Sequence, residues 1–423
     1  MRSVSRLPNG LVVVTQEMPQ MTSVSLGIWV GVGGRHEPAS LSGVSHFIEH
    51  MLFKGTQRRS ALRISQDVEG IGGYLNAFTT EECTCFYSKA CHDRFPELLD
   101  VLMDMFLHSK FDSGEIDKER NVIKEELAMY LDQPHQQVQE LLNETLWPNH
   151  PLGRSLTGTE ATLDALNRSH LRKYQRDYYT SGATIIAAAG NLKHSEVVSA
   201  VKRYSRQMPA GGTHRFVPAS VVQTAPRIRL HTKRTEQTQL ALGVRTCSRH
   251  DERRFALRLL NTILGENTSS RLFQVVREEH GLAYSVASSL GYYQDTGVLN
   301  IAVGLETGRL EKALKLIITE LRRLVRTPVP TGELRRARDY VIGQMELSLE
   351  NTESQMMWIA EQWLGYGRIF SPDEITKRLT AIKPSDIQAT AMEFLRPERL
   401  NLALVSPLKK ADRLQSALAR VSH

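Results

Sequence analysis

The sequence has few cysteines, and their spacing does not form a disulfide framework. Four occur among 423 residues, Cys83, Cys85, Cys91 and Cys247, and none of them makes a C-x-x-C pair. A secreted chain that depended on disulfides would carry more cysteines at regular spacings. We therefore expect free thiols, a reducing compartment and a cytoplasmic protein.

Long apolar runs are also lacking. No hydrophobic stretch approaches the ~18 residues that would span a bilayer. The N-terminus, MRSVSRLPNGLVVVTQEMP, has no charged head followed by an apolar core and a small-residue cleavage site. This pattern predicts neither a signal peptide nor contact with a membrane.

The chain has no large excess of one charge. Lysine and arginine together number 53 against 46 acidic residues, which gives a net charge of +7. The basic residues are scattered, and clusters such as LRRLVR have helical spacing, so a solvated surface is favoured over a nucleic-acid interface. We expect no nucleic-acid partner. The length suggests two or three domains at ~150 residues each.

The order of the expected elements occurs twice along the chain. Proline and glycine concentrate in residues 207–226, which we interpret as a linker between domain 1–206 and domain 227–423. SGEIDKERNVIKEEL (113–127) aligns with TGELRRARDYVIGQM (331–345), and both read as amphipathic helices. These patterns predict an α+β fold with two duplicated domains.

The two copies differ in their polar residues. In this alignment Glu119 corresponds to Ala337 and Glu126 to Gln344, and the second-half helix LRLLNTILG contains no histidine. Acids and imidazoles that are kept in only one copy indicate a single polar site. We expect that site at the interface between the two halves.

The segment GVSHFIEHMLFKGT (43–56) contains the pattern H-x-x-E-H. On a helix that advances about 100° per residue, Glu49 and His50 lie about 60° and 40° from His46, so all three share one face. Two imidazoles one turn apart can reach one metal ion, and the carboxylate between them can accept a proton from water. The alternative is a core helix with polar residues on its rim.

A third ligand is expected on the acidic helix EIDKERNVIKEELAMY. Glu119 and Glu126 are seven residues apart and share a face with Ile123, whereas Glu125 points elsewhere as a surface acid. Buried carboxylates are costly unless they are paired or bind metal. Glu126 would be the ligand, and Glu119 would accept the ring N–H of a ligating histidine. A helix–helix salt bridge is the alternative for both.

HFIEH followed by ERNVIKEE, with Glu126 76 residues beyond His50, resembles the pitrilysin-type zinc peptidases, the inverzincins. LPNGLVVVTQEMP and HPLGRSLTGTEATL are also similar to this family, so the resemblance covers most of the chain. It implies one zinc ion per chain, bound by His46, His50 and Glu126, with Glu49 as general base. It also implies that the two domains, each with a mostly antiparallel sheet and helices, form a clamshell around the active site.

Two further segments carry the resemblance. GGYLNAFTTEECTCFY is similar to the family's substrate-pairing edge strand, which implies that Asn76, Ala77 and Phe78 contact an extended peptide. SSRLFQVVREEHGLAYSVAS is similar to the segment that supplies an arginine and a tyrosine to the reacting peptide. By this resemblance Arg277 and Tyr284 stabilise the oxyanion of the transition state.

The resemblance implies a zinc-dependent endopeptidase that hydrolyses unfolded peptides inside a closed chamber, and a homodimer. Some members are instead weak or inactive scaffold subunits of heteromeric complexes, and this alternative stays open. The chain also resembles bacterial processing-protease-like members and the beta subunit of the mitochondrial processing peptidase. There two carboxylates receive a substrate arginine; here these positions are Gln136 and Glu140, so a preference for arginine stays open.

Overall fold

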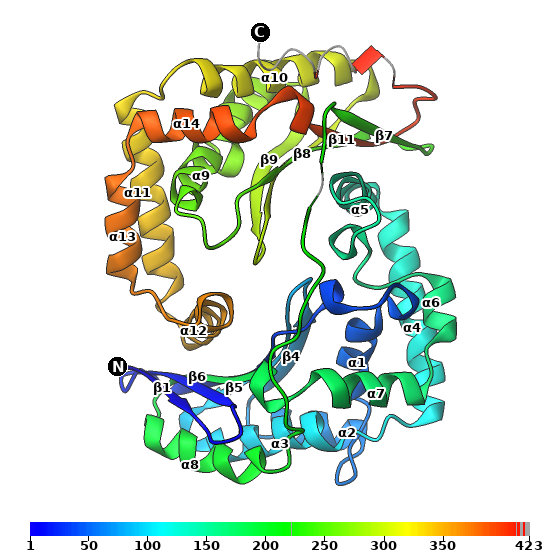
Figure 1. Ribbon diagram of the computed structural model, residues 1–423, viewed down its shortest axis with the longest axis vertical. Coiled ribbons are helices and arrows are strands. Elements are labelled where there is room, and N and C mark those ends of the chain that lie inside the picture. Colours follow the sequence, from blue (N-terminus) through cyan, green and yellow to red (C-terminus); the bar gives the residue numbers. More distant parts are fainter. Residues whose placement is uncertain (221, 412, 415–417, 419–423) are drawn as a thin grey trace. The chain divides into compact units, whose positions relative to one another are not determined.

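The computed structural model describes residues 1–423 except 221, 412, 415–417 and 419–423 (Figure 1). The chain divides into two compact units, and each unit combines segments from both halves of the sequence. Unit 1 contains Met1–Ala128, Arg154–Val217 and Leu347–Ile369, and unit 2 contains Met129–Gly153, Pro218–Glu346 and Phe370–His423.

Unit 1 is built on a six-stranded sheet in the order β1-β2-β6-β3-β5-β4. The β2 and β6 strands pair in parallel, and the other neighbours are antiparallel. Its strands are β1 (Arg2–Arg6), β2 (Val12–Glu17), β3 (Ser23–Val30), β4 (Tyr74–Thr79), β5 (Thr84–Cys91) and β6 (Thr184–Gly190). Its helices are α1 (Val44–Leu52), α2 (Ala61–Glu69), α3 (Phe95–His108), most of α4 (Ser113–Asp132), α6 (Glu160–Ala165), α7 (Arg168–Tyr178), α8 (His194–Ser205) and α12 (Thr352–Tyr366).

Unit 2 repeats this arrangement with a five-stranded sheet in the order β7-β11-β8-β10-β9. Here too one pair of neighbours, β7 and β11, is parallel and the others are antiparallel. Its strands are β7 (Arg227–Thr232), β8 (Thr238–Thr246), β9 (Ala283–Tyr292), β10 (Gly297–Leu305) and β11 (Asn401–Ser406). Its helices are α5 (Pro134–Leu146), α9 (Arg253–Asn261), η6 (Thr262–Glu266), η7 (Phe273–Glu279), α10 (Leu310–Arg326), most of α11 (Thr331–Ser348), α13 (Pro372–Ala381) and α14 (Pro384–Phe394).

Single-turn helices connect these elements: η1 (Gly34–His36), η2 (Ala39–Leu41), η3 (His92–Arg94), η4 (Pro151–Gly153), η5 (Ser181–Ala183), η8 (Thr307–Arg309) and η9 (Pro397–Arg399). The matching strand orders confirm the predicted fold class, α+β with two duplicated and mostly antiparallel sheets packed with helices. They also pair the elements of the two units: α1 corresponds to α9 with η6, α4 corresponds to α11, and β4 corresponds to β9.

The units differ from the predicted domains 1–206 and 227–423 because each sheet is covered on one face by a helix from the other half of the sequence. In unit 2, α5 packs on β8 and β11 through a cluster that includes Leu142 and Ala241. In unit 1, α12 packs on β2, β3 and β6 (Figure 1). There Met356 lies against Trp29. Both faces of each sheet are apolar, so a helix must cover the second face. In each unit this helix comes from the other half of the sequence.

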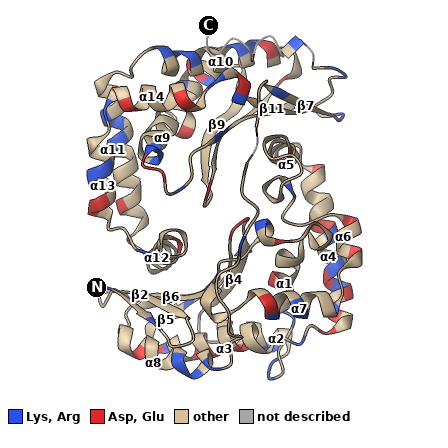
Figure 2. Ribbon diagram, viewed as in Figure 1, with Lys and Arg blue, Asp and Glu red and all other residues tan. Residues whose placement is uncertain are grey.

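One passage of the chain from unit 1 to unit 2 lies in the segment 207–226, which the sequence predicts as a linker. Around this passage, Arg154–Val217 belong to unit 1 and Pro218–Glu346 belong to unit 2. Acidic and basic residues are interspersed along the helices of both units (Figure 2).

Candidate metal centre

The α1 helix places its histidines opposite a fully apolar side. Phe47, Ile48, Met51 and Leu52 are at most 1% exposed and belong to the core of unit 1. Their spacing makes one buried stripe, which fixes the rotation of the helix. The polar side of α1, with His46, Glu49 and His50, therefore faces away from the core.

The structure brings together the three residues that the sequence predicts as metal ligands. Glu126 on α4 places its Oε2 atom 3.7 Å from Nε2 of His46 and 3.6 Å from Nε2 of His50. One donor atom from each residue lies within 4.8 Å of the others, and the described residues contain no other such group. Donors bound to one tetrahedral zinc ion would be about 3.4 Å apart. Two imidazoles and one carboxylate at this spacing fit zinc and leave a fourth position open.

Glu119 forms a hydrogen bond with the Nδ1 atom of His50, the ring nitrogen that does not face Glu126. Its Oε2 atom lies 3.1 Å from Nδ1 of His50, and its Oε1 atom lies 2.7 Å from Nζ of Lys54. A hydrogen bond from Nδ1–H to this carboxylate leaves the lone pair of Nε2 directed at the metal position. Burial opposes ionisation of Glu119, but the hydrogen bonds from His50 and Lys54 outweigh it and lower the pKa of Glu119.

His46 is kept in the form that binds metal. Burial, followed by the nearby His50, lowers the pKa of His46 to about 4. The ring is therefore neutral at neutral pH, as a ligand must be. Its Nδ1 atom is buried without a hydrogen-bond partner among the described residues.

Glu49 lies beside the three donors but is anchored differently. The hydroxyl of Thr79, the last residue of β4, donates a hydrogen bond of 2.6 Å to Oε2 of Glu49. Burial raises the pKa of Glu49, and the bond from Thr79 acts in the opposite direction. A partly buried carboxylate with one fixed oxygen is suited to accept a proton on the other.

The N-terminus of α1 is held by Glu37, which is 4% exposed. Its two carboxylate oxygens accept hydrogen bonds from the backbone N–H groups of Gly43, at 2.7 Å, and Ser45, at 2.8 Å. Gly43 has φ +91°, a conformation that favours glycine at this turn. Burial raises the pKa of Glu37 to about 7. The carboxylate satisfies amides that a helix start leaves without partners, immediately before His46.

Sequence analysis missed Glu37 and Lys54 and gave Thr79 no separate role. Thr79 does lie in the segment that resembles the substrate-pairing strand. Neither Glu37 nor Lys54 carries a local signal, because each acts through a contact with another element.

Three predicted substrate-binding residues, Asn76, Ala77 and Phe78, lie on β4, an edge strand of the unit 1 sheet that pairs only with β5 in that sheet. Asn76 is exposed, and its Oδ1 atom accepts a hydrogen bond of 2.8 Å from the N–H of Ala77. Phe78 packs against Trp29 with ring centroids 5.4 Å apart. The free edge of the strand suits backbone pairing with an extended peptide.

The remaining predicted site residues belong to unit 2. Arg277 on η7 lies over the ring of Tyr284 on β9, at 5.3 Å, and also over the ring of Phe273, at 4.7 Å. Tyr284 is 80% exposed, which is unusual for a large aromatic side chain and leaves its hydroxyl accessible. Glu140 lies on α5. The parts of these three residues in a reaction stay predictions.

Comparison with known protein families identifies both halves of the chain. The profile described as insulinase (peptidase family M16) matches residues 12–160, and that of the peptidase M16 inactive domain matches residues 165–341. The first match contains the His46, His50 and Glu126 cluster, whereas the second contains Arg277 and Tyr284.

Full-length relatives agree with these matches. The chain is 39% identical to the uncharacterized zinc protease YmxG of Bacillus subtilis, over 94% of this chain and 97% of the relative. It is 37% identical to an uncharacterized zinc protease of Streptomyces coelicolor, over 98% and 92%. The crystal structure of a protease from Helicobacter pylori has the same fold, with a TM-score of 0.89, 21% identity, and coverage of 96% of this chain and 99% of that chain.

The chain belongs to peptidase family M16, which confirms the resemblance found in its sequence. The family match and the zinc-protease relatives support a protease. No described helix is both long and apolar enough to cross a membrane.

Proposed function

We propose that this chain is a zinc-dependent endopeptidase that hydrolyses unfolded peptides. The observation that carries the proposal is the convergence of the donor atoms of His46, His50 and Glu126. Glu49 lies beside this cluster and accepts a hydrogen bond from the hydroxyl of Thr79. When bound there, zinc supplies a Lewis acid that makes a water molecule more acidic and a peptide carbonyl more electrophilic.

Residues of the chain then transfer the proton and stabilise the developing charge. Glu49 accepts the proton of the attacking water, whose oxygen forms a bond with the carbonyl carbon of the substrate. Glu49 returns that proton to the amide nitrogen as the carbon–nitrogen bond breaks. By resemblance to the family, Tyr284 and Arg277 stabilise the negative charge that develops on the carbonyl oxygen.

The edge strand β4 supports a proposal about the substrate. An extended peptide that pairs with β4 is recognised through its backbone, so it must be unfolded and its sequence matters little. Asn76, Ala77 and Phe78 would border such a peptide, and Glu140 would attract a basic side chain. We further propose a cytoplasmic homodimer that binds neither nucleic acid nor membranes; sedimentation over a range of protein concentrations tests the dimer.

The decisive experiment replaces Glu49 by glutamine, which keeps the shape of the side chain and removes its basicity. We expect one zinc per chain, as in the unchanged protein, and a fall in peptide turnover of ~10²–10⁴-fold, the usual contribution of a general base. Glu125→Gln is the matched control, because this neighbouring acid of α4 is exposed. Near-normal turnover in Glu49→Gln would refute the proposed base. Zinc binding without hydrolysis in the unchanged protein would favour a scaffold subunit.

A further inference from the structure

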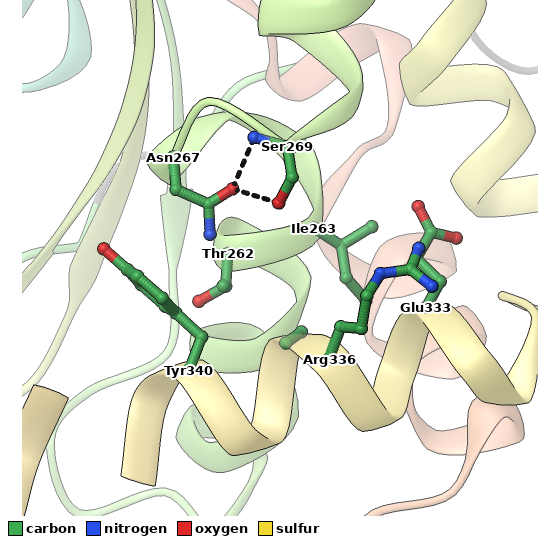
Figure 3. A pocket seen from close by; sticks show the side chains of 8 residues that line it. Thr262, Ile263, Asn267, Ser269, Glu333, Arg336 and Tyr340 are labelled. Atoms are coloured by element: carbon green, nitrogen blue, oxygen red, sulfur yellow. Dashed lines mark hydrogen bonds between the residues drawn. The ribbon is translucent and has the colours of Figure 1, made fainter. Parts of the chain in front are cut away.

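Unit 2 contains a pocket of about 250 Å³ that none of the roles above uses (Figure 3). It opens between η6, the loop that follows η6, and one side of α11. Its lining residues are Thr262, Ile263, Asn267, Ser269, Glu333, Arg336, Ala337 and Tyr340. The volume lies below the ~300–1,000 Å³ of pockets for drug-sized ligands, so only a small molecule would fit.

The pocket lies between the counterparts of the two helices that carry the metal cluster in unit 1. The η6 element continues α9, which corresponds to α1, and α11 corresponds to α4. Ala337, which lines the pocket, occupies the aligned position of Glu119. Glutamine stands at 344 where Glu126 is aligned, and α9 has the sequence RRFALRLLN without histidine. The pocket therefore lacks the two histidines and the glutamate that converge in unit 1.

The acids around the pocket are already neutralised by neighbouring arginines. Glu333 receives two hydrogen bonds from Arg271, of 2.8 and 2.7 Å. Glu266, at the end of η6, pairs with Arg258 and accepts a hydrogen bond of 2.8 Å from Thr262. Arg336 is exposed and has no hydrogen bond or ion pair with any residue that the structure describes. The balance of charge at the pocket is therefore positive.

Neutral donors accompany this arginine. The Oδ1 atom of Asn267 accepts hydrogen bonds from the backbone N–H of Ser269, at 3.1 Å, and from its hydroxyl, at 2.9 Å. Figure 3 shows the amide nitrogen of Asn267 turned away from Ser269. This nitrogen and the hydroxyl of Tyr340 have no hydrogen-bond partner within the described part of the chain. Both can donate to a ligand.

We infer that this pocket binds a small molecule through an oxyanion group, a carboxylate or a phosphate. The planar guanidinium of Arg336 presents paired N–H donors that match either group in a two-point contact. Asn267 and Tyr340 add donors, and Ile263, Ala337 and the ring of Tyr340 provide apolar walls for a compact organic body. The proposal does not rest on peptidase activity, because neither the metal cluster nor Glu49 contributes to it.

Binding of two probes to the full chain, measured by isothermal titration calorimetry, tests the site. Inorganic phosphate represents phosphate compounds, and N-acetylalanine represents a peptide carboxyl terminus. We expect saturable one-to-one binding of at least one probe, and the stronger probe identifies the source of the anion. Arg336→Gln should weaken binding at least tenfold, and Tyr340→Phe should weaken it less.

Arg335→Gln is the matched control. Arg335 is exposed on the same helix, has the same charge and does not line the pocket. It should leave the affinity unchanged. Circular dichroism establishes that each variant is folded. Absence of saturable binding of both probes overturns the proposal, and so does an equal loss in Arg335→Gln and Arg336→Gln, which indicates general attraction to a basic helix.

Discussion

The two units share a strand order, but the corresponding helices α4 and α11 carry different polar residues. On α4 and α11 the buried apolar positions are kept: Ile116 corresponds to Leu334, and Ile123 corresponds to Val341. All four side chains are at most 7% exposed. The polar positions change, since glutamates at 119 and 126 are aligned with alanine and glutamine. Both helices therefore pack through the same apolar stripe, and the candidate metal ligand Glu126 is found on only one of them.

The starts of the two corresponding helices show the same contrast. The α1 helix is capped by the buried Glu37, whose pKa burial raises to about 7. At the start of α9, the backbone N–H of Arg253 instead donates a hydrogen bond of 2.8 Å to Oδ1 of Asp251. The hydrogen bond from Arg253 lowers the pKa of Asp251. The helix with the candidate metal ligands is therefore capped by a buried carboxylate, whereas the carboxylate that caps α9 is only partly buried.

The largest effect should come from making α4 like α11. Glu126→Gln introduces the residue that unit 2 has at the aligned position and replaces an anionic ligand by a neutral amide. We expect the zinc content to fall well below one ion per chain. Loss of a hydrogen bond that supports a ligand can lower metal affinity ~100-fold, and loss of the ligand itself should lower zinc affinity by more than that. Peptide hydrolysis should be lost with the metal.

The reciprocal change, Gln344→Glu, is the control. It should not alter zinc content, because α9 has no histidine to complete a site. Metal analysis of both variants after dialysis decides the matter. Full zinc occupancy in Glu126→Gln would exclude Glu126 as a ligand.

Tyr284→Phe tests whether unit 2 contributes to the chemistry, although the candidate metal ligands His46, His50 and Glu126 all lie in unit 1. Only a hydroxyl is lost, and the exposed side chain supports no core, so folding and zinc content should persist. If the hydroxyl stabilises the oxyanion, kcat should fall ~10²–10³-fold. KM should change much less, since the contact forms in the transition state. An unchanged kcat would remove Tyr284 from the mechanism.

Glu119→Ala copies Ala337 and removes the partner of His50. The ring of His50 loses the acceptor that fixes its orientation, so zinc affinity should fall ~10–100-fold. Competition with a chelator measures this affinity. Glu125→Ala, on the exposed side of the same helix, should have no effect. Equal affinities in the two variants would mean that Glu119 serves only as the ion-pair partner of Lys54.

The smallest effect concerns Glu37 and depends on pH. Because its pKa in the native state, about 7, lies above the ordinary value of 4.5, the native state binds more protons than the unfolded state between these values. The contribution of Glu37 to stability is therefore fully present below pH 4.5 and is lost as the pH rises through 7, by at most about 3 kcal/mol.

Glu37→Gln should lack this dependence. Urea unfolding at several pH values, with zinc in excess, should show that the stability of the variant relative to the unchanged protein rises between pH 5.5 and 8. The control is Glu69→Gln, which removes an acid of the same type from an exposed position at the end of α2. The same pH profile in Glu37→Gln and in the control would mean that the burial of Glu37 does not cause the dependence.

The candidate metal centre could be predicted largely from the sequence because most of its information is local. The five consecutive residues HFIEH are enough to place His46, Glu49 and His50 on one face of a helix. Glu126 followed from a helix face and from the comparison of duplicated segments. The free edge of β4 and the neighbourhood of Arg277 and Tyr284 also follow from segments that resemble the family.

By itself, the sequence determined the fold class, the duplication and the residues that converge on the metal position. Only the tertiary structure decided which helix covers which sheet, so that α5 belongs to unit 2 and α12 to unit 1. It alone paired Thr79 with Glu49, Lys54 with Glu119, and Glu37 with the start of α1. Periodicity reveals which side of a helix is buried, but the identity of the surface that buries it depends on contacts between segments far apart in the chain.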